Sequence, residues 1–300
     1  MTMRLTGLHL LLTYQCTLEC DHCFVWSSPE ARGTMSLRDV QEILRQAEDL
    51  GGIDWIFFEG GEPFLFYPLL LKAVRLAARK GFRVGIVSNA YWATGLREAK
   101  EALRPFRGLI QDLSLSSDRY HEAAEDGHLA ENATAAARAF GIPCSVLAVA
   151  PPEEADATGR VGQLPPGVSA VMYRGRAAKR LASRARLHPW TELDRCPYEN
   201  LRGPERVHID PEGNVHLCQG ISLGNVFERP LREIVGAYDP DAHPIAGPLL
   251  EGGPAALVRR YRVAHGRSYA DACHLCDHAR RTLRRRFPAI LRPNRMYGVP

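Results

Sequence analysis

The sequence has little lysine, no long apolar segment and no strong excess of one charge. Lysine supplies only four of its 38 basic residues, and the formal net charge is +4 over 300 residues. Every apolar run falls short of the roughly 20 residues that a membrane-spanning helix needs, and the short apolar run at the N-terminus has no small-residue cleavage site after it. A mild charge balance gives no reason to expect a nucleic-acid partner. We therefore expect a cytoplasmic protein that binds neither a membrane nor a nucleic acid.

The sequence also lacks internal repeats and low-complexity tracts, and its composition is that of a globular protein. The chain is 45% hydrophobic and 24% charged, and it is long enough to bury a core without disulfides. Eight cysteines stand out against this background. In a chain without an export signal, clustered cysteines indicate metal or redox chemistry rather than disulfides.

Strands and helices alternate through the first half of the chain. Hydrophobic patterning predicts strands at residues 7–14, 53–58, 82–89, 110–117, 144–152 and 168–173, and helices between Ser36 and Gly51 and at residues 68–81, 96–103 and 128–141. Ser36 is a suitable N-cap and Gly51 a suitable end for the first helix. Six strand–helix units imply right-handed crossovers and a parallel sheet, but they are too few to close an eight-stranded barrel. The predicted fold class is therefore α/β, with a partial, TIM-like (β/α)6 barrel whose chemistry lies at the C-terminal ends of the strands.

The pattern changes after about residue 175. A connector rich in glycine and proline covers residues 153–167, a basic segment covers residues 174–188, and two alternating runs around a Pro-Glu-Gly-Asn turn predict a hairpin at residues 206–218. We expect a barrel domain over residues 1–178 and a smaller domain, built from the hairpin and helices, over residues 179–300.

Three cysteines follow the first predicted strand with the spacing Cys-x3-Cys-x2-Cys. They are Cys16, Cys20 and Cys23, in a loop at the C-terminal end of a parallel strand. Thiolates are the preferred ligands of iron–sulfur clusters, and three of them leave one iron of a [4Fe–4S] cluster open to a chelating cosubstrate. Zinc is the alternative, with His22 as the nearest further ligand, although His22 sits between two of the cysteines.

This motif resembles the radical S-adenosylmethionine (SAM) superfamily, whose signature is the same cysteine spacing after the first strand of a partial barrel. That family often has an aromatic residue where this chain has His22. After the second strand comes a Gly-Gly-Glu-Pro motif at Gly60, Gly61, Glu62 and Pro63. Alone it fits a tight turn, but after the three cysteines it resembles the family motif that binds the methionyl amine of SAM. Paired glycines let a ligand approach the backbone closely, and Glu62 can accept hydrogen bonds from an ammonium group.

Short polar residues follow the third and fourth strands. By the same resemblance, Ser88, Asn89 and Ser116 bind the ribose and carboxylate of SAM, while Asp118 is equally suited to cap a helix. The resemblance implies that a cluster reduced by a flavodoxin or ferredoxin splits SAM into methionine and a 5′-deoxyadenosyl radical. That radical removes a hydrogen atom from a substrate carbon.

A second group of cysteines, Cys196, Cys218, Cys273 and Cys276, lies in the C-terminal segment. Four thiolates can ligate a [4Fe–4S] cluster or a zinc ion, and the spacing alone does not choose between them. The order of these cysteines, the run Gly213–Cys218 and the Arg-Gly-Arg-Ala run at Arg174–Ala177 resemble the Twitch/SPASM domain of radical SAM enzymes. This resemblance implies one auxiliary [4Fe–4S] cluster.

Three functions remain open. We favour an oxidoreductase that turns an alcohol into a ketone in natural-product biosynthesis, because a short core with one auxiliary cluster resembles the aminocyclitol dehydrogenases. The second is a maturase that crosslinks or epimerises a ribosomal peptide, although only 15 residues precede Cys16 and leave little room for a peptide-recognition module. The third is a noncatalytic zinc-binding interaction protein. No side chain carries a signature of a catalytic role, and we expect Cys144, His121, His208 and His216 to be core or structural residues.

Overall fold

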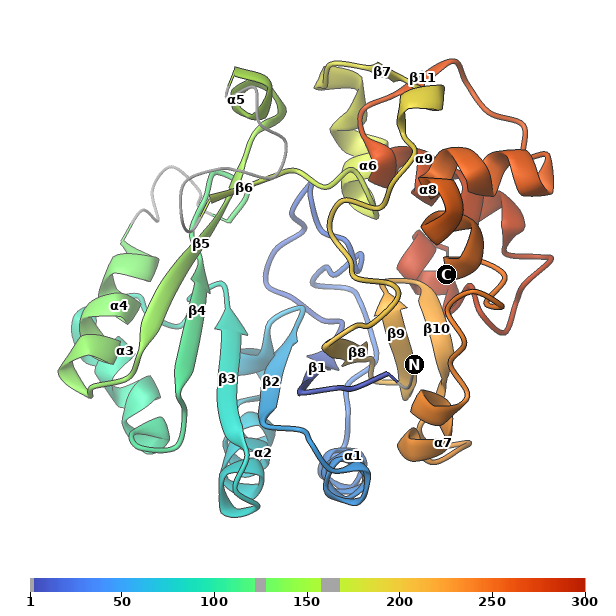
Figure 1. Ribbon diagram of the computed structural model, residues 1–300. Helices are drawn as coiled ribbons and strands as arrows, with labels where there is room; N and C mark the ends of the chain where they lie inside the picture. The colour runs from blue at the N-terminus through green and yellow to red at the C-terminus, as the bar shows by residue number, and fades with distance from the viewer. Residues whose placement is uncertain (1–2, 122–127, 158–167, 300) are drawn as a thin grey trace.

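A computed structural model describes residues 3–121, 128–157 and 168–299. In this part of the chain one nine-stranded sheet has the order β10-β9-β8-β1-β2-β3-β4-β5-β6 and curves from β6 at one edge to β10 at the other (Figure 1). Its strands are β1 (Gly7–Thr13), β2 (Trp55–Gly60), β3 (Arg83–Ser88), β4 (Asp112–Ser116), β5 (Cys144–Ala150), β6 (Val168–Ala170), β8 (Arg206–Ile209), β9 (Asn214–Cys218) and β10 (Ile221–Asn225). A separate two-stranded sheet pairs β7 (His188–Pro189) with β11 (Ser268–Tyr269).

Strands β1 to β6 pair in parallel, each with its neighbour in sequence. The helices between them are α1 (Leu37–Leu50), α2 (Tyr67–Arg79), α3 (Leu96–Leu103), α4 (Leu129–Ala139) and α5 (Pro152–Ala157). Helices α1 to α4 lie along the outside of the curved sheet (Figure 1). The predicted fold class, an α/β partial barrel, is confirmed.

Helix α1 forms where the local sequence predicts it. The Ser36 hydroxyl accepts a hydrogen bond from the Asp39 backbone N–H at 3.2 Å, and the Asp39 carboxylate accepts one from the Ser36 N–H at 2.7 Å, so the first turn carries a complete capping box. Gly51 ends the helix with φ +74°, a value that favours glycine. Val40 and Leu44 lie one turn apart and are buried against the sheet, as an amphipathic helix requires.

The C-terminal half continues the same sheet. The predicted hairpin forms as β8 and β9, which pair antiparallel, and β8 also pairs in parallel with β1. The remaining helices are α6 (Arg176–Arg180), α7 (Leu231–Gly236), α8 (Ala246–Tyr261) and α9 (Ala272–Leu283), and α8 and α9 lie above the β9–β10 hairpin in the view of Figure 1. The division into domains at residues 178 and 179 stays a prediction, and the sheet itself runs across it.

Two predicted boundaries need correction. The connector at residues 153–167 begins with helix α5, because proline in the first turn and Glu153 and Glu154 next to it favour a helix N-terminus; residues 158–167 lie outside the described residues. The sixth strand ends at Ala170 rather than at Tyr173, since the backbone then turns toward α9, where the Tyr173 N–H lies 3.3 Å from an Asp271 carboxylate oxygen.

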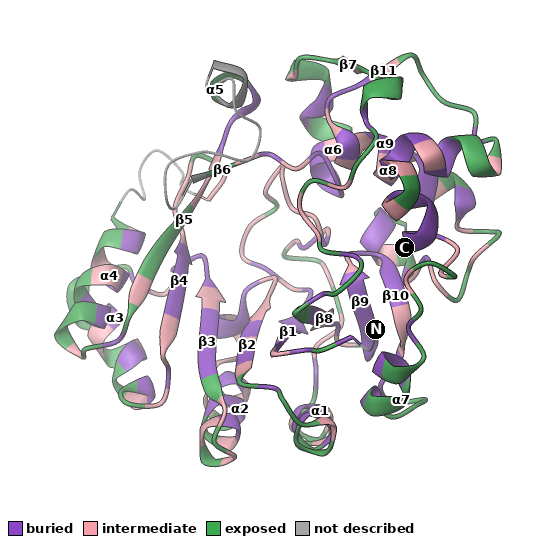
Figure 2. Cartoon of the chain, in the orientation of Figure 1, coloured by how far each residue is buried: buried purple, intermediate pink, exposed green. Residues whose placement is uncertain are grey.

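Burial follows this architecture. Strand β1 is buried along almost its whole length. Leu8, Leu10 and Leu12 alternate along it and share one face, as expected of a central strand packed against helices. Figure 2 shows exposed residues concentrated on the outer helices and the C-terminal segment. None of the described helices is both long and apolar enough to cross a membrane.

Candidate functional site

The C-terminal ends of the parallel strands open onto a cavity of about 670 Å³. This volume is within the range of roughly 300–1,000 Å³ that is usual for small-molecule sites. Residues predicted to form the site that line the cavity are Cys16, Cys20, Cys23, Gly60, Gly61, Ser88, Asn89 and Ser116. Segments far apart in the sequence therefore meet at one cavity.

The first three cysteines occupy the loop after β1 and face the cavity together. Burial raises the pKa of the Cys16 thiol to about 11, and the nearby Cys23 thiol adds to the rise. Burial, with the Cys23 and Cys16 thiols beside it, also holds the pKa of Cys20 well above its ordinary value. Such thiols ionise readily only beside a positive centre, because a coordinating metal deprotonates its thiol ligand. The donor set therefore fits an iron–sulfur cluster.

The Arg-Gly-Arg-Ala run fastens this cysteine loop from the other half of the chain. The buried Arg176 guanidinium donates hydrogen bonds to the carbonyl oxygens of Cys20 at 2.7 Å and Ser27 at 2.6 Å, and the Arg176 backbone N–H donates to the Cys23 carbonyl at 2.9 Å. Gly175 has φ +61°, and a Cβ there would lie 2.5 Å from the Cα of Phe24. Only glycine lets the two segments approach this closely.

The Gly-Gly-Glu-Pro motif presents backbone, not a carboxylate, to the cavity. Gly60 and Gly61 line it, whereas Glu62 is 0% exposed. The Glu62 carboxylate accepts hydrogen bonds from the Ser88 hydroxyl at 3.0 Å and the Asn89 backbone N–H at 2.7 Å, which ties the end of β2 to that of β3. Pro63 begins the 3-10 turn that follows. Burial raises the pKa of Glu62 to about 7, and binding of an ammonium group by Glu62 stays a prediction.

The polar residues Asn89 and Asp118, which follow β3 and β4, make different contacts. The Asn89 side chain donates to the Thr17 hydroxyl at 2.9 Å and lies 3.6 Å from the Cys16 sulfur, so it joins β3 to the cysteine loop. Asp118 accepts from the Tyr120 N–H at 2.9 Å and pairs with His121 at 2.8 Å. Asp118 thus stabilises its own turn; the helix that it was expected to cap falls on residues 122–127, outside the described residues.

The second cysteine group converges on a separate, small pocket. Cys196, Cys218, Cys273 and Cys276 all line it, together with Arg174, Glu199 and Arg280. Burial raises the pKa of Cys276 to about 12. Arg174 and Glu199 line the large cavity as well, and an Arg174 nitrogen lies 3.1 Å from the Glu199 carboxylate and 3.2 Å from the Cys218 sulfur. This ion pair forms the wall between the two pockets.

Comparison with known protein families agrees with this geometry. A family model described as the radical SAM superfamily matches residues 10–160, which include the cysteine loop and the glycine motif. The chain belongs to the radical SAM superfamily. Membership in the radical SAM superfamily implies a [4Fe–4S] cluster and SAM as cofactors.

Sequence relatives of this radical SAM protein cover only part of it. The putative peptide biosynthesis protein YydG of Bacillus subtilis (strain 168) is 28% identical over 111 residues, which cover 37% of this chain and 35% of that protein. The antilisterial bacteriocin subtilosin biosynthesis protein AlbA of the same strain is 30% identical over 107 residues, which cover 35% of this chain and 23% of that protein. The chain thus spans about a third or less of the length of these curated relatives.

Among solved structures, BtrN in complex with AdoMet and 2-DOIA aligns over 92% of this chain and 93% of that chain. The TM-score is 0.55 and the sequence identity 16%. At this identity the likeness shows the fold, which extends through the C-terminal half of this radical SAM protein.

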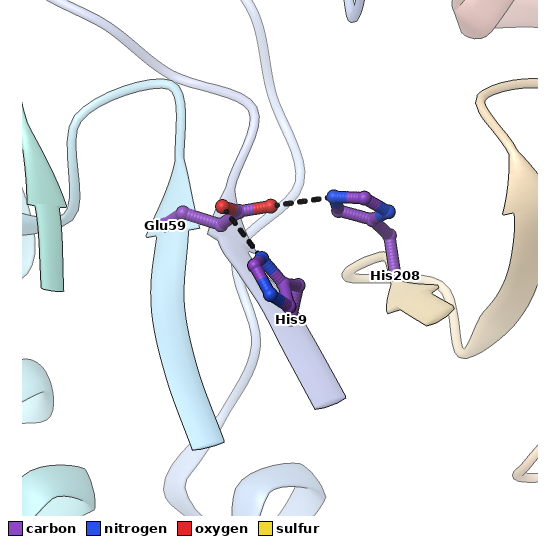
Figure 3. Close-up of side chains that lie close together, drawn as sticks. All are labelled: His9, Glu59 and His208. Carbon is purple, nitrogen blue, oxygen red and sulfur yellow. Dashed lines mark hydrogen bonds and ion pairs between the residues drawn. The ribbon is translucent and has the colours of Figure 1, made fainter. Parts of the chain in front are cut away.

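The cavity also holds a cluster that the sequence did not indicate. His9 on β1, Glu59 on β2 and His208 on β8 meet at its wall (Figure 3). A weak signal existed, since His9 is a polar residue inside an otherwise apolar strand, but its partners depend on the pairing of β1 with both β2 and β8. His208 was expected to be structural and instead lines the cavity, whereas His216 is fully buried on Asp210 at 2.9 Å as expected.

Proposed function

We propose that this radical SAM protein binds a [4Fe–4S] cluster through Cys16, Cys20 and Cys23 and cleaves SAM reductively to begin radical chemistry. The observation that carries the proposal is the convergence of these three thiols with the glycine motif on one cavity. When bound, the cluster and SAM supply an electron and a radical that removes a hydrogen atom from carbon. A flavodoxin or ferredoxin is the proposed source of that electron.

The chain's own residues have supporting tasks in this proposal. The backbones of Gly60 and Gly61 and the polar groups of Asn89 and Ser116 line the cavity where SAM would lie, and the segment around Arg176 holds the cysteine loop in place. The C-terminal half closes one side of the cavity, which limits the entry of water. Exclusion of water protects a reactive intermediate from side reactions.

We further propose that residues 179–300 form a Twitch/SPASM-like domain with one auxiliary [4Fe–4S] cluster on the second cysteine group. Within the described residues, no three cysteine sulfurs lie within 4.8 Å of one another. Zn–S bonds of roughly 2.3 Å in a tetrahedron would bring thiolates to about 3.8 Å. The wider spacing supports a multi-iron centre and counts against the zinc-binding interaction protein.

The favoured reaction is oxidation of a polar small molecule, with the auxiliary cluster as electron acceptor. The likeness to BtrN, solved with 2-DOIA, runs through nearly the whole chain and supports a compact enzyme of this type. The second candidate is maturation of a ribosomal peptide, which the sequence relatives YydG and AlbA favour because both are named for peptide biosynthesis.

The test is anaerobic reconstitution followed by incubation with dithionite and SAM. We expect iron and sulfide near eight per chain, as two clusters require, and formation of 5′-deoxyadenosine. Cys20→Ala should abolish 5′-deoxyadenosine, and Cys276→Ala should spare it while impairing substrate turnover. Cys144→Ala is the matched control, because this partly buried cysteine lies at the start of β5, outside both groups. Zinc without sulfide, or equal loss from Cys20→Ala and Cys144→Ala, would contradict the proposal.

A further inference from the structure

Glu59 lies between two imidazole rings in the cavity wall (Figure 3). His9 Nδ1 is 3.2 Å from Glu59 Oε2, and His208 Nε2 is 3.1 Å from Glu59 Oε1. The rings are 5.0 Å apart between centroids, and the His9 ring stacks on Phe57 at 4.7 Å. Each imidazole therefore contacts a different carboxylate oxygen and is held in a fixed orientation.

The charges follow from this arrangement. Although burial alone would raise it, pairing with His9 and His208 holds the pKa of Glu59 well below its ordinary value, so this residue is a carboxylate. Burial lowers the pKa of His208, so its ring is neutral near pH 7. A carboxylate only accepts hydrogen bonds, so His9 places its Nδ1–H toward Glu59. His208 Nε2 lies 3.1 Å from Glu59 Oε1 without hydrogen-bond geometry, and a proton on this nitrogen avoids repulsion from the carboxylate. In a neutral ring with its N–H on the Glu59 side, the nitrogen left with a lone pair is Nε2 for His9 and Nδ1 for His208.

These two lone-pair nitrogens are available to a ligand. No described residue donates a hydrogen bond to either of them, and neither is among the fully buried unpartnered atoms. Both residues line the cavity. Glu199 and Arg206 line the same cavity, so its wall carries charges of both signs and suits a polar substrate.

We propose that His9, Glu59 and His208 form a substrate site whose two free nitrogens accept hydrogen bonds from a hydroxyl or amine group on the carbon that loses hydrogen. The proposal rests on the proposed function, and it names the substrate class of that reaction: alcohols and amines in a polyhydroxylated small molecule.

The same site accounts for the proton of the reaction. Oxidation of a secondary alcohol to a ketone removes one hydrogen atom from carbon, one electron, and the hydroxyl proton. When bound, SAM would supply the radical that accepts the hydrogen atom, and an auxiliary cluster held by the second cysteine group would supply an acceptor for the electron. An imidazole nitrogen of this site takes the proton as the C=O bond forms, and Glu59 stabilises the resulting imidazolium. A positioned base of this kind contributes roughly 10²–10⁴-fold to a rate.

A metal ion is the competing occupant, because two histidines and one carboxylate also form a metal-binding triad. Among the described residues, His9 forms a hydrogen bond with Glu59 Oε2, whereas Glu59 Oε1 has no hydrogen-bond partner, so metal analysis decides between the two occupants. Zinc or manganese bound in equal amount to the chain, and lost on replacing His9 or His208, would overturn the proposal.

Two variants remove only the free nitrogens. In His9→Asn the amide nitrogen can replace Nδ1 as donor to Glu59, and in His208→Gln it can replace Nε2, so both keep the contact and lose the base. His128→Gln is the control, since the His128 side chain is 82% exposed on the surface. His128→Gln should form 5′-deoxyadenosine without substrate within about twofold of the wild type.

The first readout needs no substrate. NMR of the oxidised holoenzyme labelled with heavy nitrogen in its histidine rings should show an Nδ1–H tautomer that disappears in His9→Asn and an Nε2–H tautomer that disappears in His208→Gln. The opposite tautomers, or doubly protonated rings near pH 7, would overturn the proton-accepting role. Failure to form 5′-deoxyadenosine would reject the proposed function and leave these tautomers unchanged.

The second readout is calorimetric binding of scyllo-inosamine, an aminocyclitol, to holoenzyme with SAM. Binding should weaken at least tenfold in both variants, remain unchanged in His128→Gln, and be undetectable for cyclohexylamine, which has the ring and amine but no hydroxyls. Failure of the wild type to bind scyllo-inosamine, or equal binding of cyclohexylamine, would overturn the substrate class.

Discussion

Gly61→Ala tests whether the glycine motif is set by backbone crowding. A Cβ at Gly61 would lie 2.1 Å from the carbonyl oxygen and 2.5 Å from the carbonyl carbon of Gln15, and 2.8 Å from the Tyr14 oxygen. These are backbone atoms, so no side chain can rotate away. The two hydrogen bonds that join this turn to β1, from Gly61 N–H to Thr13 at 2.7 Å and from Glu62 N–H to Gln15 at 2.8 Å, must then stretch. Strain of roughly 1–3 kcal/mol plus weakened hydrogen bonds of roughly 1 kcal/mol each gives a destabilisation of about 3 kcal/mol.

Gly236→Ala is the matched control for Gly61→Ala. A Cβ at Gly236 meets nothing within 4 Å, and this exposed residue ends helix α7. Differential scanning fluorimetry of anaerobic holoenzyme should place the midpoint of Gly61→Ala roughly 5–10 °C below that of Gly236→Ala. Formation of 5′-deoxyadenosine should fall in Gly61→Ala alone, because Gly61 lines the cavity. Melting of both variants within about 1 °C of each other would refute the crowding argument.

Three further changes probe other parts of the fold. Arg176→Ala should lower the iron content to about half, because the carbonyls of the cysteine loop lose their buried hydrogen-bond donors. Arg180→Ala, which breaks only exposed ion pairs, should keep the iron content of the wild type. Equal iron contents of the two variants would contradict this prediction. Gln46→Leu should lower the free energy of unfolding by roughly 2–4 kcal/mol, because the buried Val226 carbonyl and Leu231 N–H lose their hydrogen-bond partner. A drop in melting temperature no larger than that of Gly236→Ala would speak against this prediction. Burial lowers the pKa of His243 from 6.5 to about 4. The unfolded state therefore binds the proton first, and the free energy of unfolding falls as the pH drops below 6.5, by about 2 kcal/mol at pH 5. In His243→Asn, which keeps a hydrogen-bond acceptor, the melting temperature should depend less on pH over this range, and an unchanged slope would refute the assignment.

The parts of the fold that the sequence predicted are those fixed by local signals. Ser36 and Asp39 cap α1 within one turn, and α3 begins and ends at Leu96 and Leu103 as expected. Alternating residues also predicted the hairpin of β8 and β9. The pairing of β8 with β1 was beyond such reasoning, since it joins strands almost 200 residues apart and no local periodicity specifies a distant partner.

The same distinction holds for the cavity. The convergence of Cys16, Cys20 and Cys23 on the cavity could be predicted, because the three cysteines lie in one loop. The hydrogen bonds of the Glu62 carboxylate could not, because their donors, Ser88 and Asn89, lie at the end of the next strand. His9, Glu59 and His208 come from three strands, so only the sheet order brings them together.

The C-terminal half is therefore part of the cavity wall, and not an accessory placed behind it. Strand β8 contributes His208 to the cavity wall, and Arg174 with Glu199 separates that cavity from the second cysteine pocket. The Tyr14 hydroxyl donates to the buried Asp210 carboxylate at 2.9 Å, which ties the end of β1 to the hairpin next to the cysteine loop. In the proposed reaction the two cysteine centres exchange a substrate electron and must keep a fixed separation, and a shared sheet with buried polar contacts provides it. The predicted domain boundary at residue 178 separates the two cysteine groups in sequence. The sheet that fixes the distance between them crosses this boundary without a break.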